Sequence, residues 1–151
     1  MEYIEGETLE ALVRRLGTTP GYACELFGAL CDAAAELHAG FAAAGEHSVP
    51  VIHRDLKPSN IIVSGVRYSA DAGMTFTSLV IIDLGIARAW RDGADADTVK
   101  FGTRPYAPPE QYGFGQTSVR SDVYALGALL FFCLTGVDPK PGQGMREQCE
   151  A

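Results

Sequence analysis

Apolar residues recur at helical spacing in two stretches near the start of the chain. The first follows Thr8, a residue type that caps helices, and ends at Gly17. The second begins at Thr19 and Pro20, which supply a cap and a proline at the first helical position, and it is rich in alanine. The pattern predicts two helices over residues 8–39, and we expect the second to be largely buried.

A third apolar stretch lies toward the end of the chain. Ser121 can cap this helix, and Gly136 follows its end. Its expected apolar face consists of Val123, Leu126, Leu130, Cys133 and Leu134. This stripe predicts that the helix over residues 121–136 is the most buried element of the fold.

Short runs of β-branched and other apolar residues frame the polar segments in the middle of the chain. They lie at residues 51–52, 61–63 and 79–82, and the third run stops at Asp83. Together with the helical patterns, they predict an α+β fold that is mainly helical with short β-elements.

Composition narrows the possible partners of this fold. The chain has 151 residues, of which 47% are hydrophobic, enough to bury the core of one domain or of part of one. Its 12 Lys and Arg residues against 19 Asp and Glu give a formal charge of -7, and no basic stripe is visible. No nucleic acid partner is therefore expected.

Three features of the sequence bear on location. The four cysteines form no C-x-x-C pair, which favours reduced thiols, and residues 1–7 are acidic where a secretory signal is basic and then apolar. The longest apolar stretch, residues 125–137, is well short of the roughly 20 residues that cross a bilayer. We therefore expect a cytoplasmic location and no membrane segment in this chain.

Four motifs follow one another along the chain. Residues 53–60 read His-Arg-Asp-Leu-Lys-Pro-Ser-Asn, residues 83–85 read Asp-Leu-Gly, and Gly-Thr at 102–103 and Pro-Pro-Glu at 108–110 come next. The octet fits the signature H-R-D-L-x-x-x-N at every specified position, and the later motifs are similar to the D-F-G turn and to the Gly-Thr and A-P-E ends of an activation segment. In these motifs the chain resembles the eukaryotic-like (Hanks-type) serine/threonine protein kinases, in the style of their bacterial members.

The resemblance implies phosphoryl transfer from ATP, with Mg2+, to a protein hydroxyl. It assigns Asp55 to accept the substrate hydroxyl proton and Lys57 to a place near the transferred phosphate. It assigns Asn60 and Asp83 as metal ligands, since Mg2+ prefers hard oxygen donors. Taken alone, Asp83 is more often a turn former. Lysine at position 57 is similar to the serine/threonine kinases, so the implied partner is a protein substrate with Ser or Thr hydroxyls.

The resemblance extends to the flanks of these motifs. Residues 1–7 look like the kinase hinge, in which the backbones of Glu2 and Ile4 contact adenine, and Ile62 is implied as a further nucleotide contact. Asp122 matches the aspartate of the family's helix F, which holds the backbone of the catalytic loop. Its alternative role is a capping carboxylate, which the helix dipole favours at that place.

The implied unit is a partial protein kinase domain over residues 1–151, mainly its C-terminal lobe. Its segments are the hinge (1–7), helices D and E (8–39), the catalytic loop region (51–63), the metal-binding turn with the activation segment (79–112) and helix F (121–136). No G-x-G-x-x-G loop, β3 lysine or helix C glutamate precedes the hinge, so we expect the N-terminal lobe to be missing upstream. The arginine that pairs with the A-P-E glutamate is absent too, which predicts that Glu110 has no partner.

Two functions remain open for such a chain. It is either the catalytic lobe of a serine/threonine kinase, inactive as an isolated fragment, or a truncated kinase that acts as a non-catalytic protein-binding module. Retention of Asp55, Lys57, Asn60 and Asp83 together favours the enzyme, because a binding module has no physical need for that set.

Overall fold

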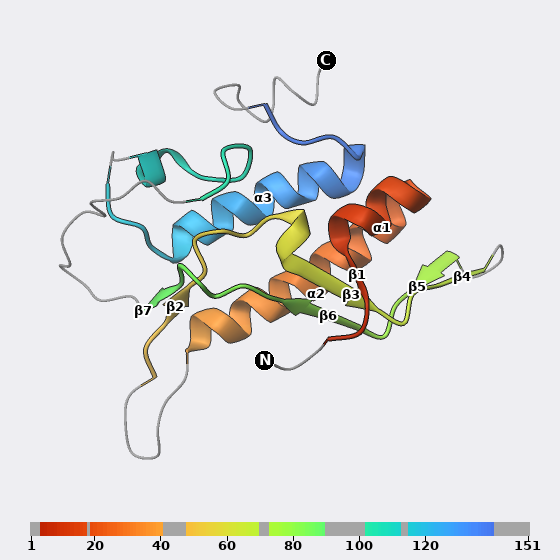
Figure 1. The fold of residues 1–151 in the computed structure, drawn as a ribbon, viewed down its shortest axis with the longest axis horizontal. Helices are drawn as coiled ribbons and strands as arrows, with labels where there is room; N and C mark the ends of the chain where they lie inside the picture. Colours follow the sequence, from red (N-terminus) through yellow and green to blue (C-terminus); the bar gives the residue numbers. More distant parts are fainter. Residues whose placement is uncertain are drawn as a thin grey trace.

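Three α-helices and a set of short strands make up the described part of the chain (Figure 1). The computed structural model describes residues 4–17, 19–40, 48–69, 73–89, 102–112 and 115–140. The helices are α1 (Leu9–Leu16), α2 (Pro20–Ala39) and α3 (Val119–Thr135). The expectation of an α+β fold with short β-elements is confirmed at this level.

Helices α1 and α2 begin and end where local capping chemistry places them. Thr8 accepts a hydrogen bond from the Ala11 amide at 3.1 Å, and Gly17, at φ +70°, ends α1. Thr19 caps α2, and Pro20 occupies its first turn. The bounds of both helices confirm the prediction.

Helix α2 buries one face only. The buried residues recur at helical spacing, whereas the residues between them are partly or fully exposed. This face consists of Tyr22, Ala23, Leu26, Leu30, Ala34 and Leu37. The expectation that α2 is largely buried is therefore wrong, because its alanines are spread around the helix and only those on the core side are covered.

Helix α3 begins earlier than the sequence suggested. Its cap is Ser118, which accepts from the Arg120 amide at 3.2 Å, and not Ser121. Ser121 instead stands at the third helical position and accepts from the Ser118 amide at 3.0 Å, so the two serines form a reciprocal capping box. Gly136, at φ +70°, ends the helix as predicted.

Helix α3 contributes more buried residues than either of the other helices, which confirms its predicted burial: nine of its 17 residues are buried. The predicted apolar face is only partly correct, because Val123 and Leu134 are 56% and 44% exposed. The buried side is centred instead on Ala125, Leu129 and Phe132, which belong to the main hydrophobic core together with residues of α1 and α2.

The strands form three small antiparallel sheets. The largest has the order β1 (Glu7–Thr8), β3 (Ile61–Ser64) and β6 (Ser78–Ile81). The second pairs β2 (Val51–Ile52) with β7 (Arg88–Ala89). The third is a hairpin of β4 (Arg67–Ser69) and β5 (Gly73–Thr75), which the sequence pattern did not predict. The three runs predicted from the sequence are confirmed as the strands β2, β3 and β6.

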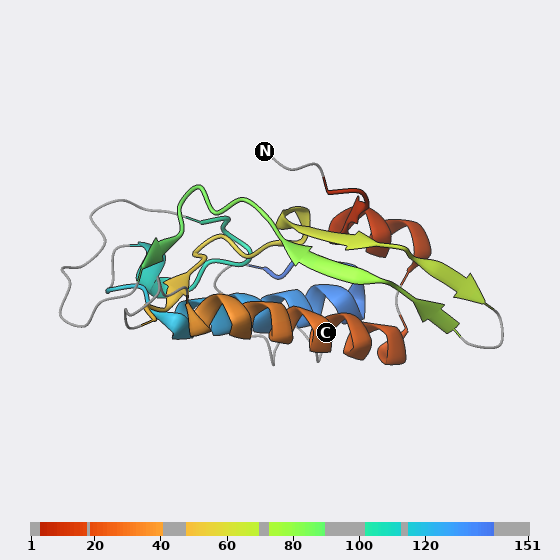
Figure 2. The ribbon, with the colours of Figure 1, turned by 90° about the horizontal axis from the view of Figure 1, so that it is seen from below.

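The elements are arranged in two layers. Figure 2 shows α2 and α3 side by side in one layer, with α1, β3 and β6 in the other. Two short 3-10 helices, η1 (Pro58–Asn60) and η2 (Pro109–Tyr112), lie in the connecting segments. The first motif connects β2 to β3, the second follows β6, and the last two lie between β7 and α3. Within the described ranges, no helix is both long and apolar enough to span a bilayer.

Candidate active site

Residues 53–60 form the loop between β2 and β3, and a buried carboxylate holds its backbone. Asp122, in the first turn of α3, accepts hydrogen bonds from the His53 amide to Oδ2 at 2.8 Å and from the Arg54 amide to Oδ1 at 2.9 Å. Asp122 is 1% exposed, so both bonds are made away from water, where charge-assisted hydrogen bonds are strong. The expectation that Asp122 holds this loop is confirmed.

A histidine from α2 completes the environment of this carboxylate. His38 Nε2 lies 2.8 Å from Asp122 Oδ2, so helix α2 also supports the loop. This contact was not predicted from the sequence. The two residues are 84 positions apart, and no local pattern around His38 signals a partner.

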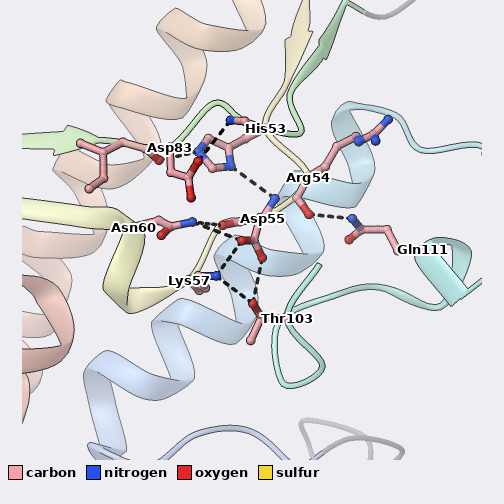
Figure 3. Close-up of polar contacts among 10 residues, drawn as sticks. His53, Arg54, Asp55, Lys57, Asn60, Asp83, Thr103 and Gln111 are labelled. Atoms are coloured by element: carbon pink, nitrogen blue, oxygen red, sulfur yellow. Dashed lines mark hydrogen bonds and ion pairs between the residues drawn. The ribbon is translucent and has the colours of Figure 1, made fainter. Parts of the chain in front are cut away.

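Asp55 lies at the centre of a polar cluster (Figure 3). Lys57 Nζ donates to Asp55 Oδ2 at 2.7 Å, and the Thr103 hydroxyl donates to Asp55 Oδ1 at 2.9 Å. Lys57 Nζ also donates to Thr103 Oγ1 at 3.1 Å. Each carboxylate oxygen therefore has a fixed donor, and one of these donors, Thr103, comes from outside the loop.

Asn60 joins the same cluster through its amide nitrogen. Nδ2 donates to the Asp55 carbonyl oxygen at 2.9 Å and to Asp55 Oδ2 at 3.3 Å. Because both bonds use the nitrogen, the amide oxygen is the atom of Asn60 that can coordinate a cation.

Asp83 follows β6 and is placed beside Asn60 by the backbone. The Ile82 amide donates to the Asn60 carbonyl at 2.9 Å, and the Ile82 carbonyl contacts His53 Nε2 at 3.0 Å. Asp83 has φ +64°, a left-handed conformation that aspartate tolerates, and its exposed carboxylate accepts from the Gly85 amide at 3.2 Å. The turn-forming role and a ligand role are thus compatible at this residue.

The backbone of Arg54 is held from two sides. Arg54 has φ +71°, which is uncommon for a residue other than glycine. Its amide donates to Asp122, and its carbonyl accepts a hydrogen bond from Gln111 Nε2 at 2.6 Å. Gln111, in η2, is 4% exposed. Gln111 was not predicted from the sequence, because a glutamine next to Glu110 carries no local signal of a distant carbonyl partner.

The segment over residues 102–112 is anchored to the first turn of α3 and to the residues that follow the end of α3. Ser121 Oγ donates to Glu110 Oε1 at 2.7 Å, so the expectation that Glu110 has no partner is wrong: the third residue of α3 supplies one. Tyr106 donates to Asp138 Oδ1 at 2.5 Å. Burial, and then the hydrogen bond to Asp138, raise the pKa of Tyr106, so this phenol stays protonated and acts as a donor.

The predicted nucleotide contacts are less completely covered by the described residues. Ile62 on β3 packs against Gly6: a Cβ at Gly6, where φ is +154°, would lie 2.7 Å from Ile62 Cγ2. Ile62 therefore lies next to the segment that follows Ile4, which is itself half-buried. Glu2 lies outside the described residues, as do Met1 and Tyr3 of the predicted hinge.

The described side chains do not form a self-sufficient metal centre. Among them there is no group of three His, Cys, Asp or Glu residues with metal-binding geometry. The amide oxygen of Asn60 and the carboxylate of Asp83 are hard oxygen donors, the kind of ligand that Mg2+ prefers.

Comparison with known proteins agrees with this arrangement. Residues 1–151 match the protein kinase domain family. Over 146 residues, the chain is 36% identical to the serine/threonine-protein kinase PknB of Mycobacterium tuberculosis, an alignment that covers 94% of this chain and 20% of that protein. It is 34% identical over 142 residues to PknB of Mycobacterium leprae, covering 92% of this chain and 20% of that protein.

A more distant relative gives the same result. The probable serine/threonine-protein kinase PknB of Corynebacterium glutamicum is 32% identical over 147 residues, which covers 95% of this chain and 20% of that protein. The chain thus spans about a fifth of the length of these curated relatives. The octet geometry, the family match and these relatives together show that the chain belongs to the protein kinase family, among its bacterial Hanks-type serine/threonine members.

Proposed function

We propose that this chain supplies the catalytic residues of a serine/threonine kinase, which transfers the γ-phosphoryl group of ATP to a protein hydroxyl. The observation that carries the proposal is the Asp55 carboxylate, fixed at one oxygen by Lys57 and at the other by Thr103. A carboxylate that is oriented before substrate arrives meets the main demand of phosphoryl transfer, which is positioning.

Each residue of the cluster has a proposed role. Asp55 orients the substrate hydroxyl and accepts its proton. Lys57 places a positive charge beside the transferred group, where negative charge is spread over the phosphoryl oxygens. Thr103 holds the side chains of Asp55 and Lys57 in place relative to each other, a role that its two hydrogen bonds support.

The oxygen atoms of Asn60 and Asp83 are the proposed ligands of Mg2+. When bound, the ion neutralises charge on the ATP phosphates. The donor chemistry supports this assignment, because the Asn60 nitrogen is engaged by Asp55 while its oxygen and the exposed Asp83 carboxylate are hard oxygen donors.

The nucleotide site and the segment assignments belong to the same proposal. The backbones of Glu2 and Ile4 in the hinge (1–7) contact adenine, and Ile62 contacts the base from β3. Helices α1 and α2 correspond to helices D and E of the C-terminal lobe, and α3 corresponds to helix F. We place the reaction in the cytoplasm, where ATP and protein substrates meet.

The 151 residues contain no glycine-rich phosphate loop. The proposed reaction therefore needs additional groups to hold the β- and γ-phosphates, of the kind that a kinase N-terminal lobe supplies. A suitable protein for testing the reaction is a chimera in which this chain replaces the region of Mycobacterium tuberculosis PknB that it matches.

The proposal is tested by identifying the amino acid that this chimera phosphorylates. The chimera is incubated with Mg2+, labelled ATP and a generic protein substrate, and the hydrolysed product is separated into phosphoamino acids. We expect phosphoserine or phosphothreonine, and no label with the Asp55→Asn variant. A chimera that binds ATP and the substrate but yields neither phosphoserine nor phosphothreonine would instead support a non-catalytic binding module.

A further inference from the structure

Arg54, the residue that precedes Asp55, is bonded to two separate parts of the molecule. Its amide is held by Asp122 of α3, and its carbonyl is held by Gln111 of η2, with φ at +71° between them. A left-handed conformation at a residue other than glycine persists only where the surroundings enforce it. Figure 3 shows the hydrogen bond from Gln111 to the Arg54 carbonyl, which holds this backbone unit on one side, while Asp122 holds its amide on the other.

The hydrogen bond from Gln111 is enclosed. Gln111 is 4% exposed, and the void that Arg54, Gln111 and Asp122 line has no room for a water molecule. A water molecule therefore cannot replace the Gln111 amide as a donor without a local opening of the structure. Losing the donor leaves the buried Arg54 carbonyl without its hydrogen bond, which favours a different backbone conformation at this residue.

Gly102 packs directly against this hydrogen bond. A Cβ at Gly102 would lie 3.1 Å from Gln111 Nε2 and 3.2 Å from the Arg54 carbonyl oxygen. Gly102 has φ +94°, which also favours glycine. The Gly-Thr pair therefore does two things: Thr103 contacts the Asp55 carboxylate, and Gly102 leaves room for the bond behind it.

We propose that Gln111 is a positioning residue, which makes the backbone geometry at Arg54 and Asp55 depend on the end of the predicted activation segment. The inference rests on the proposed kinase function of Asp55. When η2 is seated on α3, the Gln111 amide holds the Arg54 carbonyl and keeps the left-handed turn that directs the Asp55 carboxylate toward Lys57 and Thr103. When η2 moves, that support is lost, so the activation segment acts on catalysis through the backbone as well as through Thr103.

The direct test measures amide hydrogen exchange in the 151-residue chain. The amides of His53, Arg54 and Asp55 all donate hydrogen bonds, so their exchange reports the state of the loop. The variant Gln111→Met keeps similar volume and removes the donor. We expect exchange in residues 53–57 to become at least about tenfold faster, while exchange in α1 and α2 is unchanged and the melting temperature falls by no more than about 4 °C.

Two further variants keep the test decisive. Gly102→Ala leaves Gln111 in place but crowds its bond, and it should speed exchange in the same residues. Tyr112→Phe is the matched control, because it removes a hydrogen bond from the neighbouring side chain to the Arg104 carbonyl, outside the loop. It should leave residues 53–57 protected. Wild-type exchange at residues 53–57 in both Gln111→Met and Gly102→Ala would overturn the proposal, as would a uniform increase across α1 and α2.

A kinetic measurement on the PknB chimera separates this inference from the proposed function. With Gln111→Met we expect kcat to fall about tenfold while KM for ATP stays within about twofold, because the loop acts on the substrate hydroxyl and not on adenine. Unchanged kcat in this variant of an active chimera would contradict the positioning role. An inactive wild-type chimera would count against the kinase function, while the exchange data would still decide whether Gln111 controls the loop.

Discussion

At the scale of single residues, the site depends on buried groups that hold backbone more than on the exposed side chains. Asp122 binds two consecutive amides of the catalytic loop, and His38 contacts the same carboxylate. The octet motif predicts which residues carry chemistry. The residues that support them come from α2, α3 and η2, and only Asp122 among these was expected from sequence.

The first prediction concerns Asp122. Replacing it with alanine leaves two buried amides and His38 without their carboxylate acceptor, and we expect the free energy of unfolding to fall by about 3–5 kcal/mol. Urea denaturation of the 151-residue chain measures this change. His38→Gln, which keeps a donor, should lower stability much less. An effect of Asp122→Ala below about 1 kcal/mol would show that the carboxylate does not support the loop.

The second prediction concerns Thr103. Valine has nearly the same shape but lacks the hydroxyl, so Thr103→Val removes the contacts to both Asp55 and Lys57. Hydrogen bonds to charged groups are each worth roughly 1.5–3 kcal/mol, so we expect kcat of the PknB chimera to fall tenfold to about a hundredfold. Thr103→Ser, which keeps the hydroxyl, should retain most activity. Equal activity of Thr103→Val and wild type would remove Thr103 from the proposed mechanism.

At the scale of elements, the sequence predicted best the helix ends that capping residues determine locally. Helix α1 has the predicted bounds because Thr8 and Gly17 act within a few residues of their own positions. The start of α3 was misplaced because two serines three positions apart can both cap, and in the structure they form one capping box in which Ser118 is the cap and Ser121 stands at the third helical position.

Elements without a strong pattern, and contacts between distant segments, were not predictable in the same way. The β4–β5 hairpin is short, and the residues of β4 are all exposed, so no apolar alternation marks it. The contacts from His38 to Asp122 and from Gln111 to Arg54 join segments 84 and 57 residues apart. Such contacts follow from how α2, α3 and η2 pack, and no spacing rule in the sequence contains them.

The third prediction concerns the core of α3 at alkaline pH. Burial raises the pKa of the Cys133 thiol from 9.0 to about 12. The unfolded chain therefore releases this proton at lower pH than the folded chain does. The stability linked to Cys133 is fully present below about pH 9 and is lost as pH rises from about 9 toward about 12, by at most about 1.4 kcal/mol per pH unit.

Urea unfolding at pH 8 and pH 10 measures this loss. We expect the Cys133→Ala variant to lose less stability between the two values than wild type does. Burial also raises the pKa of Tyr22, so some alkaline destabilisation should remain in the variant. An identical pH dependence in both proteins would mean that the Cys133 thiol is not held in the core.

At the scale of the whole molecule, one layer of helices supports loops that bring the active-site residues together. Asp55, Lys57 and Asn60 come from one loop, Asp83 from the end of β6, and Thr103 from the segment before η2 (Figure 3). These residues supply the groups proposed to act on the substrate hydroxyl and on Mg2+. The 151 residues include no glycine-rich loop to fix the ATP phosphates.

The fourth prediction follows from this division. The 151-residue chain alone should transfer no measurable phosphate, because misplacement of the reacting phosphate by about 1 Å reduces the rate by roughly a hundredfold. Its affinity for ATP should also be weak, since much of the apolar face of adenine stays in contact with water. Isothermal titration with Mg2+ and ATP measures the affinity, and the PknB chimera should bind ATP more tightly than the isolated chain.

In the proposed reaction, Asp55, as held in this fold, orients a protein hydroxyl and accepts its proton during phosphoryl transfer. The most direct test compares the initial rate of labelled γ-phosphate transfer to a serine/threonine protein substrate for the PknB chimera, its Asp55→Asn variant and the isolated chain. We predict transfer by the chimera alone. Transfer that persists at a similar rate in the Asp55→Asn chimera would contradict the assignment of Asp55, and robust transfer by the isolated chain would contradict its dependence on further phosphate-binding groups.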